Sequence, residues 1–151
     1  MAEVAIRNMT RRPAPRFAYE VAAASILPTW EVSLVFVGRA RATSLNRTLR
    51  NKDYVPNVLS YAVGKRSGEV VICLDVAKKQ APDYKMSYRD FVLFLFIHGL
   101  MHLKGRAHGP TMEKEERAHL ARLLTIRTKN GPTQNRNRNR HRHAPNKGRR
   151  R

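Results

Sequence analysis

The feature that most restricts the fold of this chain is a long apolar segment in its second half. The segment reads YRDFVLFLFI over residues 88–97 and remains largely apolar through Leu103. It is too long for a typical strand, and its first part contains neither proline nor glycine. Ser87 precedes it, and a serine hydroxyl can accept a hydrogen bond from a free backbone N–H of the first helical turn. We therefore predict a largely buried helix over residues 87–104.

Three histidines occur where this segment ends, in the sequence HGLMHLKGRAH. His98 and His102 are four residues apart, so a helix directs both side chains toward the same side. Gly105 can end the helix because it adopts the left-handed conformation at little cost, and the chain can then bring His108 back. Three neutral imidazoles suit zinc and leave its fourth tetrahedral position open for water. The pattern predicts an open zinc site of the catalytic kind.

Other interpretations of the three histidines explain their spacing less well. Single histidines on apolar helices are usually core or surface residues, but three at this spacing with a glycine are not easily explained that way. Cys73, the only cysteine, lies in an apolar run and is predicted to pack in the core. His119, His141 and His143 are assigned no metal role. The spacing also matches metzincin proteases, which carry a glutamate general base after the first histidine. Gly99 stands there, so the motif favours zinc without favouring proteolysis.

The remaining elements follow from the apolar periodicity of the chain. Strands are predicted at residues 4–8, 32–37, 57–63 and 69–74. Further helices are predicted at residues 14–26, 40–49 and 112–124. The order βαβαββαα predicts an α+β domain with a small mixed β-sheet, helices packed on it, and the zinc site at the end of the buried helix.

The chain is strongly basic, with 30 Lys and Arg against 11 Asp and Glu and a formal net charge of +19. This imbalance favours a polyanionic partner, of which nucleic acid is the first candidate.

Residues 127–151 hold ten basic residues, no acidic residue and no large apolar side chain. We therefore predict one domain over residues 1–126 and a disordered basic tail over 127–151. The tail serves either as an electrostatic arm for RNA or as a solubilising extension.

The expected compartment is the cytoplasm. A single cysteine gives no internal disulfide framework and fits a reducing environment. No apolar run is long enough to cross a membrane. The apolar patch at residues 21–27 is short and follows the acidic Glu20, so we do not interpret it as a signal peptide.

Five motifs occur in the order found in a known family. They read VSLVFV, SLNRTLRNKD, VPNVLSYA, GEVVICLDVA and FIHGLMHLKGRAH, and they span roughly residues 31–124. In this respect the chain resembles the YbeY family, bacterial zinc-dependent endoribonucleases implicated in ribosomal RNA maturation and ribosome quality control. The resemblance implies zinc ligands at His98, His102 and His108. It also implies a functional arginine at Arg50, whose planar guanidinium is suited to bidentate contact with phosphate.

The chain departs from the family pattern in two places, just before the third histidine and just before the third predicted strand. Arg106 and Ala107 stand where the family usually has Tyr-Asp before the third histidine, which removes a carboxylate beside a zinc ligand. Pro56 replaces a usual threonine at the start of the third predicted strand. Asn57 and Ser60 in that strand are candidate substrate contacts, and Arg106 is a candidate phosphate contact. No residue stands out as the general base.

Together with the histidine motif, the resemblance implies a zinc-dependent, single-strand endoribonuclease that hydrolyses phosphodiester bonds with a zinc-activated water. The partners that the resemblance implies are single-stranded RNA, ribosomal RNA in particular, and the ribosomal subunit or ribosome-associated proteins. Two alternatives remain open. One is a non-catalytic RNA-binding or ribosome-associated protein that retains the zinc site. The other is a zinc hydrolase of a different substrate, such as a peptide.

Overall fold

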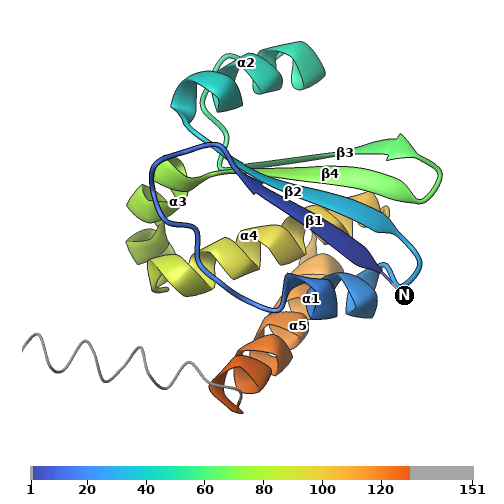
Figure 1. Cartoon of the computed structure of the whole chain (residues 1–151). Helices are drawn as coiled ribbons and strands as arrows, with labels where there is room; N and C mark the ends of the chain where they lie inside the picture. Colours follow the sequence, from blue (N-terminus) through green and yellow to red (C-terminus); the bar gives the residue numbers. More distant parts are fainter. Residues whose placement is uncertain (1, 130–151) are drawn as a thin grey trace, which may run out of the picture.

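The computed structural model describes residues 2–129, which form a sheet of four strands with helices on both faces (Figure 1). The spatial order of the strands is β1-β2-β4-β3. β1, β2 and β4 run parallel, and β3 pairs with β4 in the antiparallel direction, so the sheet is mixed. The strands are β1 (Glu3–Asn8), β2 (Glu31–Val37), β3 (Val58–Gly64) and β4 (Ser67–Cys73).

The helices divide between the two faces of this sheet. α1, α4 and α5 lie on one face, and α2 lies on the other (Figure 1). α3 and the following 3-10 turn η1 connect β4 to α4 at one end of the sheet. The helices are α1 (Tyr19–Ile26), α2 (Arg39–Arg50), α3 (Leu74–Gln80), η1 (Ala81–Tyr84), α4 (Tyr88–Leu103) and α5 (Pro110–Lys129).

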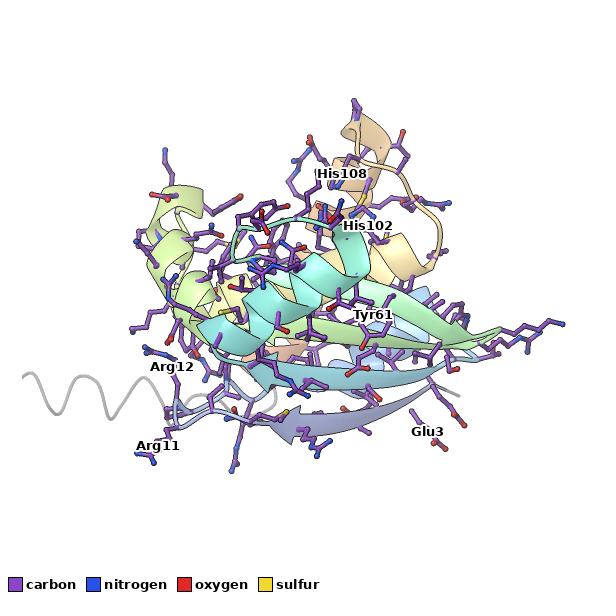
Figure 2. All side chains as sticks on the ribbon, turned by 90° about the horizontal axis from the view of Figure 1, so that it is seen from above. Glu3, Arg11, Arg12, Tyr61, His102 and His108 are labelled. Atoms are coloured by element: carbon purple, nitrogen blue, oxygen red, sulfur yellow. The ribbon has the colours of Figure 1, made fainter. Side chains whose placement is uncertain are left out.

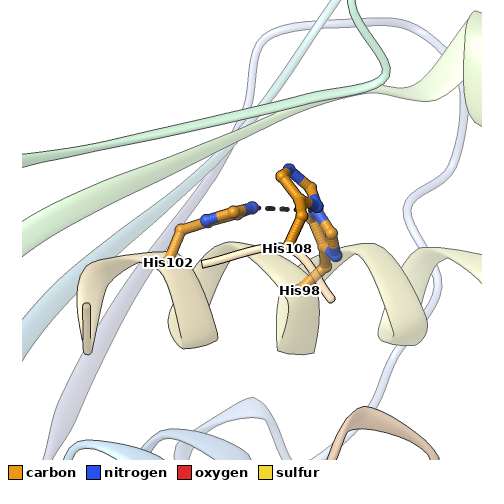
Figure 3. A group of neighbouring side chains, drawn as sticks. All are labelled: His98, His102 and His108. Carbon is orange, nitrogen blue, oxygen red and sulfur yellow. Dashed lines mark hydrogen bonds between the residues drawn. The ribbon is translucent and has the colours of Figure 1, made fainter. Parts of the chain in front are cut away.

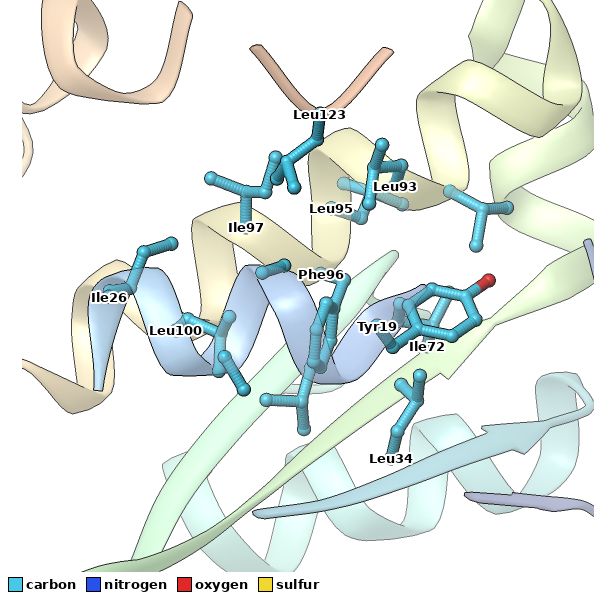
Figure 4. Packing of buried hydrophobic residues seen from close by; sticks show 14 of the residues in the cluster. Tyr19, Ile26, Leu34, Ile72, Leu93, Leu95, Phe96, Ile97, Leu100 and Leu123 are labelled. Carbon is cyan, nitrogen blue, oxygen red and sulfur yellow. The ribbon is translucent and has the colours of Figure 1, made fainter. Parts of the chain in front are cut away.

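The main core lies between the sheet and the helices of this face: α1 and α4 both contact strands, and α5 packs on α4 (Figure 4). Leu34 from β2, Ile72 from β4 and Phe96 from α4 are all fully buried there. α4 can be apolar on nearly every side because the sheet and other helices surround it. Full burial of a side chain such as Phe96 stabilises the fold by about 1.5–3 kcal/mol. This packing holds the helix that carries the first two histidines.

A smaller core lies between the sheet and α2. It contains Val37, Ala42, Leu59, Val71 and Cys73, all buried. Burial raises the pKa of the Cys73 thiol. The prediction that this cysteine packs in the core is therefore confirmed, and α2 is attached to the sheet mainly by this narrow apolar seam.

The predicted α+β class, with helices packed on a small mixed sheet, is confirmed, whereas the predicted order βαβαββαα lacks α3 and several element boundaries differ. The helix predicted from residue 14 begins only at Tyr19. Pro15 disfavours helical backbone at Ala14, which excludes the first predicted residue. α3 was not predicted, since it follows β4 directly without a turn residue. The last helix extends to Lys129. The rest of the predicted tail, residues 130–151, lies outside the described residues.

Within residues 2–129, none of the helices combines the length and the apolar character that a bilayer crossing requires.

Candidate metal centre

The three histidines of the motif meet at one point beside the C-terminal end of α4 (Figure 3). His98 and His102 lie one helical turn apart, and their Nε2 atoms are 3.1 Å from each other. His108 approaches from the following loop, with its ring centroid 4.5 Å from that of His102 and 5.3 Å from that of His98. One ligand nitrogen from each histidine lies within 4.8 Å of the others. The predicted convergence of the imidazoles is present in the fold.

Local backbone geometry produces this convergence. The Ser87 side chain accepts a hydrogen bond from the Asp90 N–H at 3.1 Å and caps the start of α4, as predicted. At the other end Gly105 has φ of 100°, a conformation that L side chains rarely adopt. The Gly105 N–H donates to the His102 carbonyl and the Arg106 N–H to the Met101 carbonyl, at 2.9 and 3.0 Å. These two bonds form a Schellman motif, which ends the helix and turns the chain back toward it.

Glu116 on α5 completes the group, and it was not identified from the sequence. Glu116 is only 4% exposed, and its carboxylate accepts a hydrogen bond from Nδ1 of His98. On α5, Met112 and Leu120 lie four residues before and after Glu116, and both are also buried. A glutamate in the apolar stripe of the last predicted helix was the signal that could have found it, because acidic side chains are rarely buried without a partner.

The donor set fits a zinc ion. With Nδ1 of His98 donating to Glu116, its Nε2 carries the lone pair, and this atom faces His102. Burial, followed by the neighbouring His98 and His108, lowers the pKa of His102 and so favours the neutral imidazole, which is the form that coordinates metals. Nitrogen ligands about 2.0–2.1 Å from a tetrahedral zinc lie about 3.3 Å apart. The observed separation of 3.1 Å between the two Nε2 atoms is close to this value.

His119, on the other hand, lies outside the cluster. It is on α5, where its Nδ1 is 3.0 Å from the guanidinium of Arg122. Burial and the positive charges of Arg122 and Lys104 lower its pKa. His141 and His143 lie outside the described residues.

A groove of about 510 Å³ opens beside the histidines. Its walls come from the start of β3, from the end of η1 and from the facing sides of α4 and α5, and its lining includes His98, His108 and Glu116. Asn57, a predicted substrate contact, lines the same groove, and its amide donates to the Gln80 side chain at 2.9 Å. A volume of this size lies in the range typical of small-ligand sites.

The other two predicted substrate contacts lie around this centre in different ways. Ser60 is on β3, and a Cβ built on Gly99 would lie 3.6 Å from that of Ser60, so the serine lies against α4. Arg106, in the loop between His102 and His108, donates to both carboxylate oxygens of Glu115 at 2.9 and 3.3 Å. This ion pair raises the pKa of Arg106 and lowers that of Glu115.

Arg50 is exposed at the last residue of α2, on the face of the sheet opposite α4 (Figure 1). It is not among the residues that line the groove. Asn51 follows it in the left-handed conformation, with φ of 58°, and ends the helix. Figure 2 views the molecule from above, with α2 in front of the sheet and with His102 and His108 labelled. The functional role of Arg50 stays a prediction.

The sequence matches a known family over most of its length. A family model described as Endoribonuclease YbeY covers residues 5–126. The chain belongs to the YbeY family. Its histidine cluster, the cap of α4 and Glu116 all lie within the matched range.

Several curated relatives carry the name Endoribonuclease YbeY. The chain is 35% identical over 98 residues to the protein of Staphylococcus carnosus, covering 57% of this chain and 64% of the relative. It is 38% identical over 100 residues to that of Alkaliphilus metalliredigens, covering 59% and 64%. For a Staphylococcus aureus relative the identity is 33% over 119 residues, covering 70% and 76%. The chain thus spans just under two thirds of the length of the first two relatives.

The fold itself is also found in a solved structure. A solution structure of a Thermotoga maritima protein superimposes with a TM-score of 0.61 and covers 97% of this chain and 99% of that one. The sequence identity is 16%, so this likeness concerns the fold alone.

Proposed function

We propose that this YbeY-family chain is a zinc-dependent, single-strand endoribonuclease that acts in ribosomal RNA maturation and ribosome quality control. The observation that carries the proposal is the cluster of His98, His102 and His108, backed by the buried carboxylate of Glu116 and open to a groove. Relatives named Endoribonuclease YbeY support the reaction class.

The three histidines would hold the zinc ion, and Glu116 would orient one of them. A carboxylate on the far nitrogen of a ligating imidazole holds its tautomer and ring orientation and makes it a better donor. Glu116 would thus supply a carboxylate to one ligand in a chain that has Ala107 where the family usually has an acidic residue beside the third histidine. Zinc in such a site polarises a phosphoryl oxygen and lowers the pKa of water.

The groove and its surroundings would bind and orient the RNA. Asn57 lines the groove, and its side-chain nitrogen donates to Gln80, which limits the orientations that its amide can adopt. Arg106 lies in the loop that carries His108, is partly exposed and pairs with Glu115 on α5. It is the candidate for a phosphate contact from this loop. Ser60 lies near Gly99 and is a candidate hydrogen-bonding group. Arg50 is the candidate for bidentate phosphate neutralisation.

Charge supports an RNA substrate over a peptide. The net charge of +19 favours a polyanion, and Gly99 stands where a zinc protease would carry its general base. Gly99 also has a packing role, because a Cβ there would lie 2.8 Å from a methyl carbon of Val70. The helix therefore has no room for a glutamate at this position.

The test is metal analysis of the purified full chain, followed by cleavage of single-stranded RNA with and without a chelator. We expect about one zinc per chain, RNA cleavage that is lost with chelator, and recovery on addition of zinc. His102→Ala should lose both metal and cleavage. His119→Ala is the matched control and should keep both, because His119 lies outside the cluster.

The outcome separates the alternatives. Zinc binding and RNA binding without cleavage would support the non-catalytic RNA-binding or ribosome-associated protein. Full zinc content in His102→Ala would place the metal elsewhere and refute the assignment of the site.

A further inference from the structure

A row of aromatic rings leads from the histidine cluster along the groove. Phe94 lies one turn before His98 on α4, and the centroids of the two rings are 6.2 Å apart. Tyr84, from η1, lies 6.2 Å from Phe94 and 4.7 Å from Phe91. Phe91 and Phe94 are stacked, with an angle of 17° between their planes. The row ends at Tyr84, which contacts Phe94, and Phe94 in turn contacts the imidazole of His98.

Tyr84 differs from the other members of the row because it is 50% exposed. Phe91, by contrast, is fully buried. Tyr84 also lines the groove together with Phe94 and His98. One side of the tyrosine therefore packs on the phenylalanines, and the rest of the ring is open to the groove. A large aromatic side chain left open beside a candidate reactive centre is available to a ligand.

The backbone holds Tyr84 in place. Lys85 follows it in the left-handed conformation, with φ of 57°. The Lys85 N–H donates to the Pro82 carbonyl at 2.9 Å, and the Met86 N–H donates to the Ala81 carbonyl at 3.1 Å. The tyrosine is thus presented by a tight turn that is closed by its own hydrogen bonds, and it needs little reorganisation to accept a planar ligand.

The groove carries polar groups of both charges, which suit the two parts of a nucleotide, and Glu113 and Arg117 are among them. Glu113 lines the groove, and its carboxylate would repel a phosphate but accept hydrogen bonds from base amino groups. The Asn57 amide offers a further polar contact. The phosphate is better placed at the histidines, where a bound zinc ion would neutralise part of its charge.

We infer that Tyr84, backed by Phe94, forms a stacking subsite for one unpaired nucleobase of the RNA substrate, beside the phosphate at the histidine cluster. The inference rests on the proposed endoribonuclease function and adds the reason for a single-strand preference. A base paired within a duplex cannot lay its face on a tyrosine, whereas an unpaired base can do so irrespective of its identity.

The subsite can be tested without any cleavage step. The probe is 2-aminopurine riboside 5′-monophosphate, a fluorescent nucleotide that has no internucleotide bond and is quenched when its base stacks. It is titrated with the zinc-supplemented full chain and with four variants. Tyr84→Ala removes the ring, Tyr84→Leu keeps apolar packing on Phe91, and Tyr84→Phe keeps a ring. Val63→Ala is the control, since Val63 is 62% exposed near the far end of β3.

We expect saturable quenching by the wild-type chain, by Tyr84→Phe and by Val63→Ala. Tyr84→Ala and Tyr84→Leu should bind the probe at least about fivefold more weakly, as expected when one base–aromatic stack is lost. Ribose 5-phosphate, which lacks a base, should bind the wild-type chain and every variant with the same low affinity, measured by its competition with the probe. On single-stranded RNA the same two variants should raise KM with little change in kcat.

Two results would overturn the inference. One is the absence of quenching by the wild-type chain, and the other is equal quenching by Tyr84→Leu and the wild type. Neither result depends on catalysis. The proposed function fails in a different experiment, if the wild-type chain with zinc does not cleave RNA. Unchanged thermal unfolding of Tyr84→Leu confirms that any loss of binding comes from the missing ring.

Discussion

Replacement of Glu116 by glutamine tests whether the buried carboxylate supports the metal site. The glutamine keeps the size of the side chain and an oxygen that can accept from Nδ1 of His98, but it removes the negative charge. Partners of this kind typically contribute 10–100-fold to metal affinity. Because the hydrogen bond survives in Glu116→Gln, we expect a loss of about tenfold, equivalent to about 1.4 kcal/mol. Glu116→Ala removes the bond as well and should approach a hundredfold.

The assay is competition for zinc against a chromophoric chelator at constant pH. Glu115→Gln is the matched control, since Glu115 is the preceding residue of the same helix but pairs with Arg106 instead. Its zinc affinity should stay within about twofold of the wild type, because surface ion pairs contribute little. Equal zinc affinities for Glu116→Gln and the wild type would refute the reasoning, as would a larger loss for Glu115→Gln than for Glu116→Gln.

Three further predictions concern the packing, the substrate contacts and the tail. Gly99→Ala should lower the free energy of unfolding by about 1–3 kcal/mol in chemical denaturation, because its Cβ would lie 2.8 Å from a Val70 methyl. Adding Val70→Ala to this variant should recover part of the loss, and a double variant whose loss equals the sum of the two single losses would contradict the contact. Arg50→Lys should reduce RNA cleavage sharply at unchanged zinc content, whereas near-normal cleavage by Arg50→Ala would make it an ordinary surface arginine. Truncation after Lys129 should weaken RNA binding and lower the log–log salt slope by about 0.7 for each phosphate that the removed segment neutralises; identical slopes would identify that segment as a solubilising extension.

Local chain geometry made much of the candidate site predictable. His98 and His102 converge because four residues make about one helical turn, whatever the surroundings of the helix. The cap at Ser87 and the left-handed turn at Gly105 likewise depend on a few neighbouring residues. The same holds for the alternation of strands and helices, which indicated the α+β class from apolar periodicity alone. These features need no knowledge of which elements become neighbours.

Tertiary packing decided the rest. Glu116 meets His98 because α5 lies against α4, and Tyr84 faces the groove because η1 returns to α4. The order β1-β2-β4-β3 brings the start of β3, with Asn57, to the same groove. Each of these contacts joins residues from different elements, and it exists only after the sheet and helices have packed together. A pattern read along one segment carries no information about such partners, because many arrangements of the same elements satisfy the same local preferences.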